Sequence, residues 1–154
     1  MVEQGSPLPD VSVTMPNGDA VPLASHKGHP LVLYFYPKDD TSGCTREAQD
    51  FSALMPVFTE AGIAVLGVSR DPAKSKTKFI EKYELTVPLA TDEGPVSEAF
   101  GTWVEKSMYG RKYMGMDRAT FLFDANGTCV QAWRKVKVPG HAEAVLKAAQ
   151  ALPA

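Results

Sequence analysis

The chain has 154 residues, of which 44% are hydrophobic and 22% charged, as expected for a single globular domain over residues 1–154. Its 16 basic and 18 acidic residues give a net charge of −2, which argues against a nucleic-acid partner. The N-terminus lacks the basic start and apolar core of a secretory signal, and no apolar run reaches membrane-spanning length. We therefore expect a cytoplasmic protein without a membrane partner.

The N-terminal part of the chain predicts a β-hairpin. Two short strand-like segments, 11–14 and 20–23, flank the turn sequence Pro-Asn-Gly-Asp at 16–19. His26 and His29 follow in a polar loop. Two histidines without a third ligand nearby do not make a metal site, so we expect no metal and no other cofactor.

The next segment combines a buried strand, a turn and a helix. The apolar run Leu31–Tyr36 is typical of a strand covered on both faces of an α/β sheet, and a proline then ends it. Thr41 stands at the expected N-cap of the helix, which places Cys44 in the first turn. Free backbone N–H groups and the helix dipole favour an anion there, and a thiolate is an anion. Because proline disrupts a helix interior, we expect a break near Met55 and a short restart at Pro56.

The remaining elements complete an α/β pattern. We expect a strand over 63–69, a helix that begins at Pro72 with Asp71 as its cap, a strand-like segment within 85–91 and a short helix around 96–100. Residues 101–117 are predicted to form a long loop beside the site. A second hairpin is expected across Asn126 and Gly127, followed by a closing helix over 142–152. This order predicts a thioredoxin-like fold, with a central mixed five-stranded sheet flanked by helices and an N-terminal β-hairpin extension.

The residues around the first cysteine resemble a known family. Pro37, Thr41 and Cys44 stand in the pattern Pro-x-x-x-Thr-x-x-Cys of the peroxiredoxins. The longer string over 34–47 is similar to the branch called peroxiredoxin Q or bacterioferritin comigratory protein. Further strings that resemble this branch lie at 65–71, 118–124 and 133–141. The resemblance therefore runs from about Gly5 to the last helix.

The resemblance implies a thiol-dependent peroxidase that reduces hydrogen peroxide and organic hydroperoxides, with Cys44 oxidised to a sulfenic acid. Such a site must ionise the sulfur and donate hydrogen bonds to the peroxide oxygens. Arg118 is the expected cation, because it precedes a strand that should run antiparallel to the first core strand. We expect the Thr41 hydroxyl and the backbone N–H groups of Gly43 and Cys44 to bind the substrate. Pro37 should shield the sulfur from water.

Ordinary alternatives exist for these residues and for the function. Taken singly, Thr41 is a helix cap, Pro37 a strand terminator and Arg118 a surface cation. A disulfide oxidoreductase of the thioredoxin type would need Cys-x-x-Cys, but Glu47 stands three residues after Cys44. A redox-sensing or chaperone-like module that acts through partner proteins would use the same thiol, and this alternative stays open.

The route that resolves the sulfenic acid is a separate question. This branch often has a second cysteine five residues after the first, where this chain has Gln49. Cys129 should lie at the far end of a strand about 17 Å long, whereas a disulfide needs Cα atoms within about 7 Å. We therefore expect a one-cysteine mechanism, in which an external thiol from a small molecule, thioredoxin or glutaredoxin reduces Cys44. The resemblance also implies a monomer.

Overall fold

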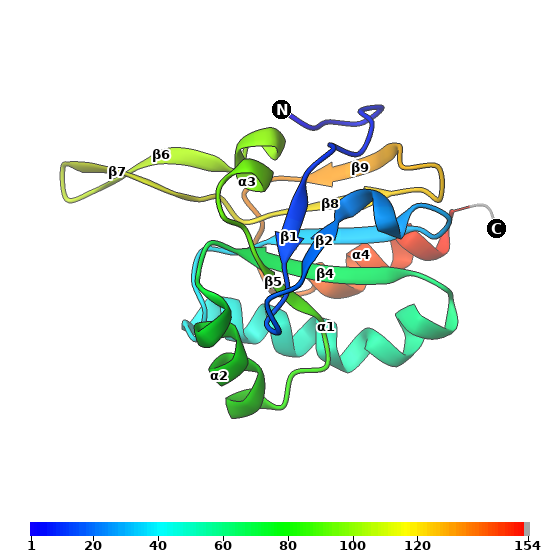
Figure 1. The fold of residues 1–154 in the computed structure, drawn as a ribbon, viewed down its shortest axis with the longest axis horizontal. Coiled ribbons are helices and arrows are strands. Elements are labelled where there is room, and N and C mark those ends of the chain that lie inside the picture. Colours follow the sequence, from blue (N-terminus) through cyan, green and yellow to red (C-terminus); the bar gives the residue numbers. More distant parts are fainter. Residues whose placement is uncertain (153–154) are drawn as a thin grey trace.

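The computed structural model describes residues 1–152, and seven of its strands form one sheet (Figure 1). These strands are β1 (Ser12–Thr14), β2 (Ala20–Pro22), β3 (Leu31–Phe35), β4 (Ala64–Ser69), β5 (Leu89–Thr91), β8 (Ala119–Phe123) and β9 (Cys129–Trp133). Their order is β2-β1-β5-β4-β3-β8-β9. The pairs β3–β4 and β4–β5 are parallel and the other neighbours are antiparallel, so the sheet is mixed as predicted.

The sheet is larger than the five strands expected from the sequence. The five expected core strands are present and adjacent, in the order β5-β4-β3-β8-β9. The N-terminal hairpin is also present, but β1 pairs with the edge strand β5 through Thr14 and Thr91. The predicted extension is therefore part of the sheet, and the strand count of five is wrong.

Helices cover both faces of the sheet. They are α1 (Ser42–Glu60), α2 (Ala73–Tyr83), α3 (Pro95–Phe100) and α4 (His141–Gln150), with a short 3-10 helix at Leu23–His26. One core joins α1, α2 and α4 to one face of the sheet, where Val32 and Tyr34 of β3 point. The second core joins α3 and the N-terminal hairpin to Leu33 and Phe35 on the other face. Every residue of β3 is buried, which explains its unbroken apolar run. Within residues 1–152, no helix has the length and apolar character to cross a membrane.

Helix α1 is continuous through its proline, so the predicted break near Met55 is wrong. Pro56 has no N–H to donate to the carbonyl of Ser52, one turn earlier. The hydroxyl of Thr86 donates to that carbonyl instead, at 3.1 Å. A residue from the segment before β5 therefore satisfies the group that the proline leaves free, and the helix continues.

The start of α2 also differs slightly from the prediction. The helix begins at Ala73, and its N-cap residue is Pro72 rather than Asp71. The Asp71 carboxylate accepts hydrogen bonds from the hydroxyl of Ser69 and from the backbone N–H of Asp39. This aspartate consequently joins two loops instead of capping the helix.

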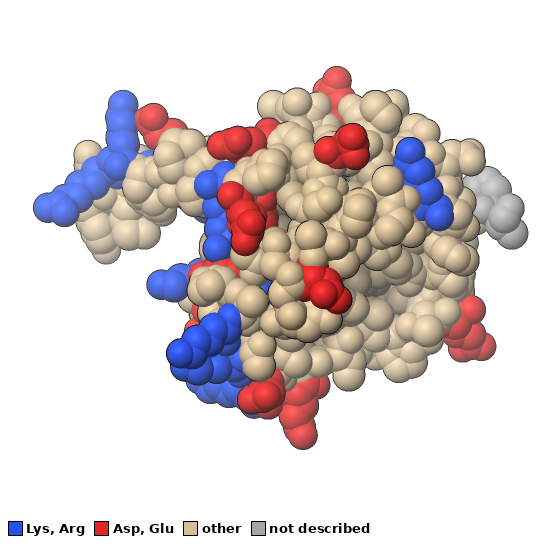
Figure 2. Space-filling view, in the orientation of Figure 1, with Lys and Arg blue, Asp and Glu red and all other residues tan. Residues whose placement is uncertain are grey.

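Residues 103–116 form a two-stranded ribbon, so the predicted long loop is wrong. Strands β6 (Trp103–Met108) and β7 (Arg111–Met116) pair across Tyr109 and Gly110, which have φ angles of 53° and 77°. Hairpin turns of this kind need positive φ, a conformation that tyrosine seldom adopts, so the turn was not recognised. The ribbon projects from the body of the protein (Figure 1). Lysines and arginines gather on the ribbon and around α2 (Figure 2), a basic side that the net charge did not predict.

Candidate active site

Cys44 is the third residue of α1, on the helix that follows β3. Its side chain is buried in the core that α1, α2 and α4 form on one face of the sheet. An Nη2 group of Arg118 donates to its Sγ atom at 3.4 Å. The antiparallel pairing of β3 and β8 accounts for this approach, because Phe35 at the end of β3 faces Ala119 at the start of β8. The predicted proximity of Arg118 and Cys44 is confirmed.

The same guanidinium also contacts Glu47. Nη1 of Arg118 donates to Oε1 of Glu47 at 2.7 Å, so the arginine bridges two residues on one face of α1. Gly43 leaves room for this bridge, since a Cβ atom there would lie 3.2 Å from Nη2 of Arg118. The cation is thus held beside the sulfur by a second contact.

Glu47 is a buried carboxyl group, with 1% of its surface exposed. Burial raises the pKa of Glu47 to about 7, although the charge of Arg118 and its hydrogen bond oppose that shift. Oε2 of Glu47 has no hydrogen-bond partner among the described residues. The structure places this residue beside the candidate site, through its contact with Arg118.

Thr41 and Pro37 lie in the loop that leads into α1, and both are exposed. Thr41 is the N-cap residue as predicted, but its side chain makes no capping bond. Its hydroxyl donates to the carbonyl of Lys38 at 2.9 Å, while its own carbonyl accepts the N–H of Thr45. The structure therefore brings Thr41 to the start of the helix without a bond from its hydroxyl to the sulfur of Cys44.

The sequence did not predict the buried polar cluster that packs against this loop. Asp39 is only 7% exposed, and its Oδ1 atom lies 3.4 Å from the Nζ atom of Lys76. Lys76 is completely buried. One sequence signal was available, because Lys76 precedes Phe79, Ile80 and Tyr83 at the spacing of the inner helix face.

The second cysteine lies far from the first. Cys129 belongs to the core on the opposite face of the sheet, and it faces Phe123 at the end of β8. Phe123 in turn faces Leu31, the first residue of β3, whereas Cys44 follows the last. Both cysteines are free thiols. The expected separation of the two thiols is thus found along the sheet and also across it.

His141 has a place in the core near the site. Its Nε2 atom lies 2.8 Å from the hydroxyl of Thr120, a residue of β8. Burial lowers the pKa of His141 to about 4, and the charge of Arg118 acts in the same direction. A neutral imidazole packed between α4 and the sheet is consistent with a structural role for His141.

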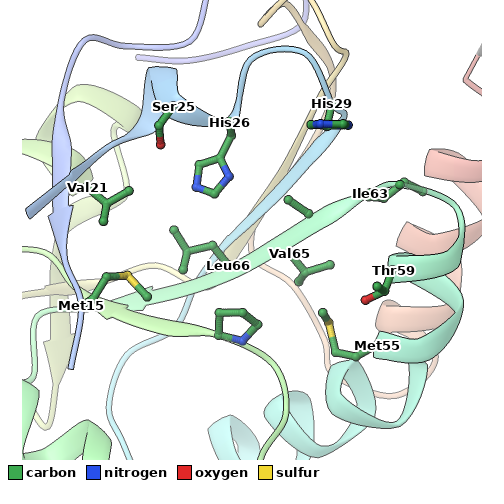
Figure 3. A pocket seen from close by; sticks show the side chains of 13 residues that line it. Met15, Val21, Ser25, His26, His29, Met55, Thr59, Ile63, Val65 and Leu66 are labelled. Atoms are coloured by element: carbon green, nitrogen blue, oxygen red, sulfur yellow. The ribbon is translucent and has the colours of Figure 1, made fainter. Parts of the chain in front are cut away.

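A separate apolar pocket of about 550 Å³ lies between the N-terminal hairpin and β4 (Figure 3). His26 and His29 are among the residues that line it, together with Met15 and Met55. None of the residues of the Cys44 site lines it. Within residues 1–152, no group of three or more histidine, cysteine, aspartate or glutamate side chains is placed to hold a metal ion.

Comparisons with known proteins identify the family of this chain. The model of the AhpC/TSA family matches residues 4–132. A peroxiredoxin Bcp from Xanthomonas campestris is 49% identical over 143 residues, covering 92% of this chain and 89% of the relative. A peroxiredoxin Bcp from Bacillus subtilis is 42% identical over 147 residues, covering 95% and 94%.

Solved structures give a consistent result. The bacterioferritin comigratory protein of Xanthomonas campestris, described for its alkyl peroxide reduction activity, has a TM-score of 0.88 at 48% identity, covering 94% of this chain and 95% of that one. A cysteine-to-serine mutant of Xylella fastidiosa PrxQ has a TM-score of 0.92 at 38% identity, covering 98% and 97%. These likenesses confirm the thioredoxin-like fold predicted from the sequence.

Proposed function

The chain belongs to the AhpC/TSA family, in its peroxiredoxin Q or bacterioferritin comigratory protein branch, and from this premise we propose that Cys44 is the peroxidatic residue. Membership makes the protein a thiol-dependent peroxidase, which acts on peroxides and needs a thiol reductant. The observation that carries the assignment is the 3.4 Å contact between Arg118 and the sulfur in the first turn of α1.

The proposed reaction transfers one oxygen to the sulfur. The Cys44 thiolate attacks one oxygen of the peroxide, the O–O bond breaks, and the product is a sulfenic acid. The other oxygen leaves as hydroxide or alkoxide and takes up a proton. Arg118 stabilises the negative charge first on sulfur and then on the leaving oxygen. The first N–H groups of a helix have no intrahelical partner, so those of Gly43 and Cys44 are available to the substrate.

Thr41 and Pro37 complete the proposed site. The Thr41 hydroxyl, which donates to the Lys38 carbonyl, has only to rotate about χ1 to offer its hydrogen bond elsewhere. In the proposed complex it donates to a peroxide oxygen. Pro37 lies at the exposed end of the loop and has no N–H that would compete for the substrate. Its ring limits the access of water.

Hydrogen peroxide and small organic hydroperoxides are the proposed substrates. The Cys44 side chain is only 2% exposed, so the reacting end of the substrate has to be slender. The similar Xanthomonas campestris protein is described for alkyl peroxide reduction, which supports organic hydroperoxides as a second class.

The sulfenic acid is proposed to be resolved by an external thiol. Cys129 lies in the opposite core and at the other end of the sheet, so it cannot reach Cys44 within the folded chain. A thiol from a small molecule, thioredoxin or glutaredoxin attacks the sulfur and releases water, which leaves a mixed disulfide. A second thiol then frees Cys44. We assign this one-cysteine cycle to a monomer.

Intact-mass measurement tests the proposal. One equivalent of hydrogen peroxide without a thiol should add one oxygen, and excess peroxide should carry Cys44 to the sulfinic acid. A small thiol added with the peroxide should restore the reduced mass. The variant Cys129→Ala should behave like the wild type, whereas Cys44→Ser should gain no oxygen. Loss of two hydrogens with a Cys44–Cys129 peptide in the digest would contradict the one-cysteine cycle.

A further inference from the structure

We propose that α2 clamps the loop that precedes Cys44, and that the buried Lys76 is the positioning residue through which the clamp sets the reactivity of that cysteine. This inference depends on the proposed role of Cys44. The loop in question, residues 36–41, is called the reactive loop below. It connects β3 to α1 and contains Pro37 and Thr41.

The inner contact of the clamp is a buried ion pair. The Nζ atom of Lys76 lies 3.4 Å from Oδ1 of Asp39 and also donates to the hydroxyl of Ser69. The hydroxyl of Tyr36 donates to Oδ1 of Asp39 at 2.5 Å, and that of Ser75 donates to Oδ2 at 2.7 Å. Ser75 and Lys76 of α2 therefore bind the carboxylate of Asp39 together with Tyr36 of the reactive loop itself, while Ser69 of β4 contacts Lys76.

The main chain of the loop is held at the same residue. The N–H of Asp39 donates to Oδ2 of Asp71 at 2.7 Å. The hydroxyl of Ser69 donates to this same carboxylate oxygen at 2.9 Å. Because both the side chain and the backbone of Asp39 are bound, the middle of the reactive loop has a defined position against β4 and α2.

The outer contact uses the next residue. Asp40 has a φ of 57°, in the left-handed region that a residue other than glycine enters only at a cost. Lys82 and Tyr83, at the end of α2, donate to its carboxylate at 2.9 and 2.6 Å. One helix thus binds two successive aspartates, one buried and one exposed. Because exposed ion pairs stabilise little, the buried contact of Lys76 is the principal one.

Stability alone does not account for a lysine in this position. The desolvation of a buried ion pair can exceed the attraction between its charges, and an apolar side chain of similar size often serves the core as well. Lys76 instead places a positive charge next to the site. The charged or titratable groups that face it are Asp39, Asp71, Tyr36 and Cys44.

The clamp has a direct consequence for reactivity. It fixes the loop immediately before Thr41 and hence the first turn of α1, whose N–H groups are proposed to bind the peroxide. A misplacement of about 1 Å in such a site can cost a factor of about 10² in rate. Loss of the Lys76 charge should therefore slow the reaction even when the protein stays folded.

The test compares Lys76→Met with Lys78→Met, which makes the same change at an exposed lysine of the same helix. The rate of Cys44 oxidation by hydrogen peroxide is measured in a single turnover, at a temperature where circular dichroism shows each variant to be folded. We expect Lys76→Met to be slower by about 10²-fold and Lys78→Met to match the wild type. A folded Lys76→Met that reacts within about threefold of the wild-type rate overturns the inference.

A second variant covers the case in which Lys76→Met does not fold. Asp39→Asn keeps the size of the side chain and removes its charge, so it should fold and show a similar loss of rate. A wild-type rate in folded Asp39→Asn also overturns the inference. Failure of the proposed function would give a different result: the wild-type protein itself would consume peroxide without oxidation of Cys44. That result needs no comparison with a variant.

The pH profile separates positioning by a charge from simple packing. Burial lowers the pKa of Lys76, while Asp39 and Asp71 oppose this shift. As the pH rises and the ammonium loses its proton, the wild type should approach the rate of Lys76→Met. If the ratio of the two rates stays constant up to alkaline pH, Lys76 acts through packing, and the proposed role of its positive charge is wrong.

Discussion

Cys44 and Cys129 are almost equally buried, with 2% and 1% of their surfaces exposed, yet their surroundings differ. Cys44 lies in the first turn of a helix, with the guanidinium of Arg118 at 3.4 Å. Cys129 lies within a strand, where its thiol is 3.6 Å from the carbonyl of Gln131, and burial raises its pKa. Exposure therefore does not distinguish the cysteine that we propose to be reactive from the one that we propose to be packed. The neighbouring donors and charges do.

The largest effect is expected when each of the two cysteines is replaced in turn. Cys44→Ser should lose peroxide consumption down to the background rate, because an alcohol does not ionise near neutral pH. Cys129→Ala should keep wild-type turnover and lose about 1 kcal/mol of unfolding free energy through its small cavity. Peroxide consumption with a small thiol and urea unfolding measure the two effects. Activity in Cys44→Ser, or its loss in folded Cys129→Ala, would reverse the assignment.

A hydrogen bond from a cation separates the two cysteines, because Arg118 donates to the sulfur of Cys44, whereas Arg134 acts on Cys129 through its charge. Arg118→Lys keeps the positive charge but loses the planar group that contacts both Cys44 and Glu47. We expect the second-order rate of oxidation by hydrogen peroxide to fall by about 10²-fold, as for the loss of one donor to a developing anion. Stopped-flow fluorescence gives the rate and near-ultraviolet circular dichroism checks the fold. An unchanged rate would remove Arg118 from the mechanism.

A smaller effect is expected at Thr41, the N-cap residue of the helix that contains Cys44. Thr41→Val keeps the shape of the side chain and removes the hydroxyl proposed to bind the peroxide. The rate should fall by roughly 10-fold, the equivalent of one hydrogen bond to a charged group. Thr41→Ser retains a hydroxyl and is the matched control, so it should stay near the wild-type rate. Equal rates in the serine and valine variants would show that the hydroxyl does not contact the substrate.

The different positions of the two cysteines could largely be predicted, because they follow from strong local sequence patterns. The apolar run of β3 predicted a strand buried on both faces, and antiparallel pairing with the strand after Arg118 placed that residue near Cys44. The turn at Asn126 and Gly127 predicted the β8–β9 hairpin and, through it, the distance of Cys129 from the site. Each inference uses residues whose partners follow from strand order alone.

Two of the features that were missed depend on partners distant in the sequence. Pro56 does not break α1, because Thr86 supplies the missing hydrogen bond from another segment. Asp39 and Lys76 are each typical surface residues, and only their mutual pairing across 37 positions makes burial acceptable. Local propensity contains no information about such pairs.

The last prediction concerns the effect on stability of Glu47, the carboxyl group that contacts the same guanidinium as Cys44. Burial raises the pKa of Glu47 to about 7 from a usual value of 4.5, so the folded protein binds a proton more tightly than the unfolded chain. The resulting stability is fully present below pH 4.5 and is lost as the pH rises through about 7. The loss should be on the order of 2–3 kcal/mol.

Glu47→Gln cannot titrate at this position, so the difference in unfolding free energy between wild type and variant should change by that amount between pH 4.5 and 7.5. His141 has the opposite effect on stability. Burial lowers its pKa from the usual 6.5 to about 4, so the free energy of unfolding decreases as the pH falls below 6.5. Both proteins contain His141, so its contribution cancels in the difference. Urea unfolding of the two proteins across this range measures the effect. Parallel curves would mean that Glu47 is already ionised in the folded protein at pH 4.5, and that Arg118 outweighs burial beside Cys44.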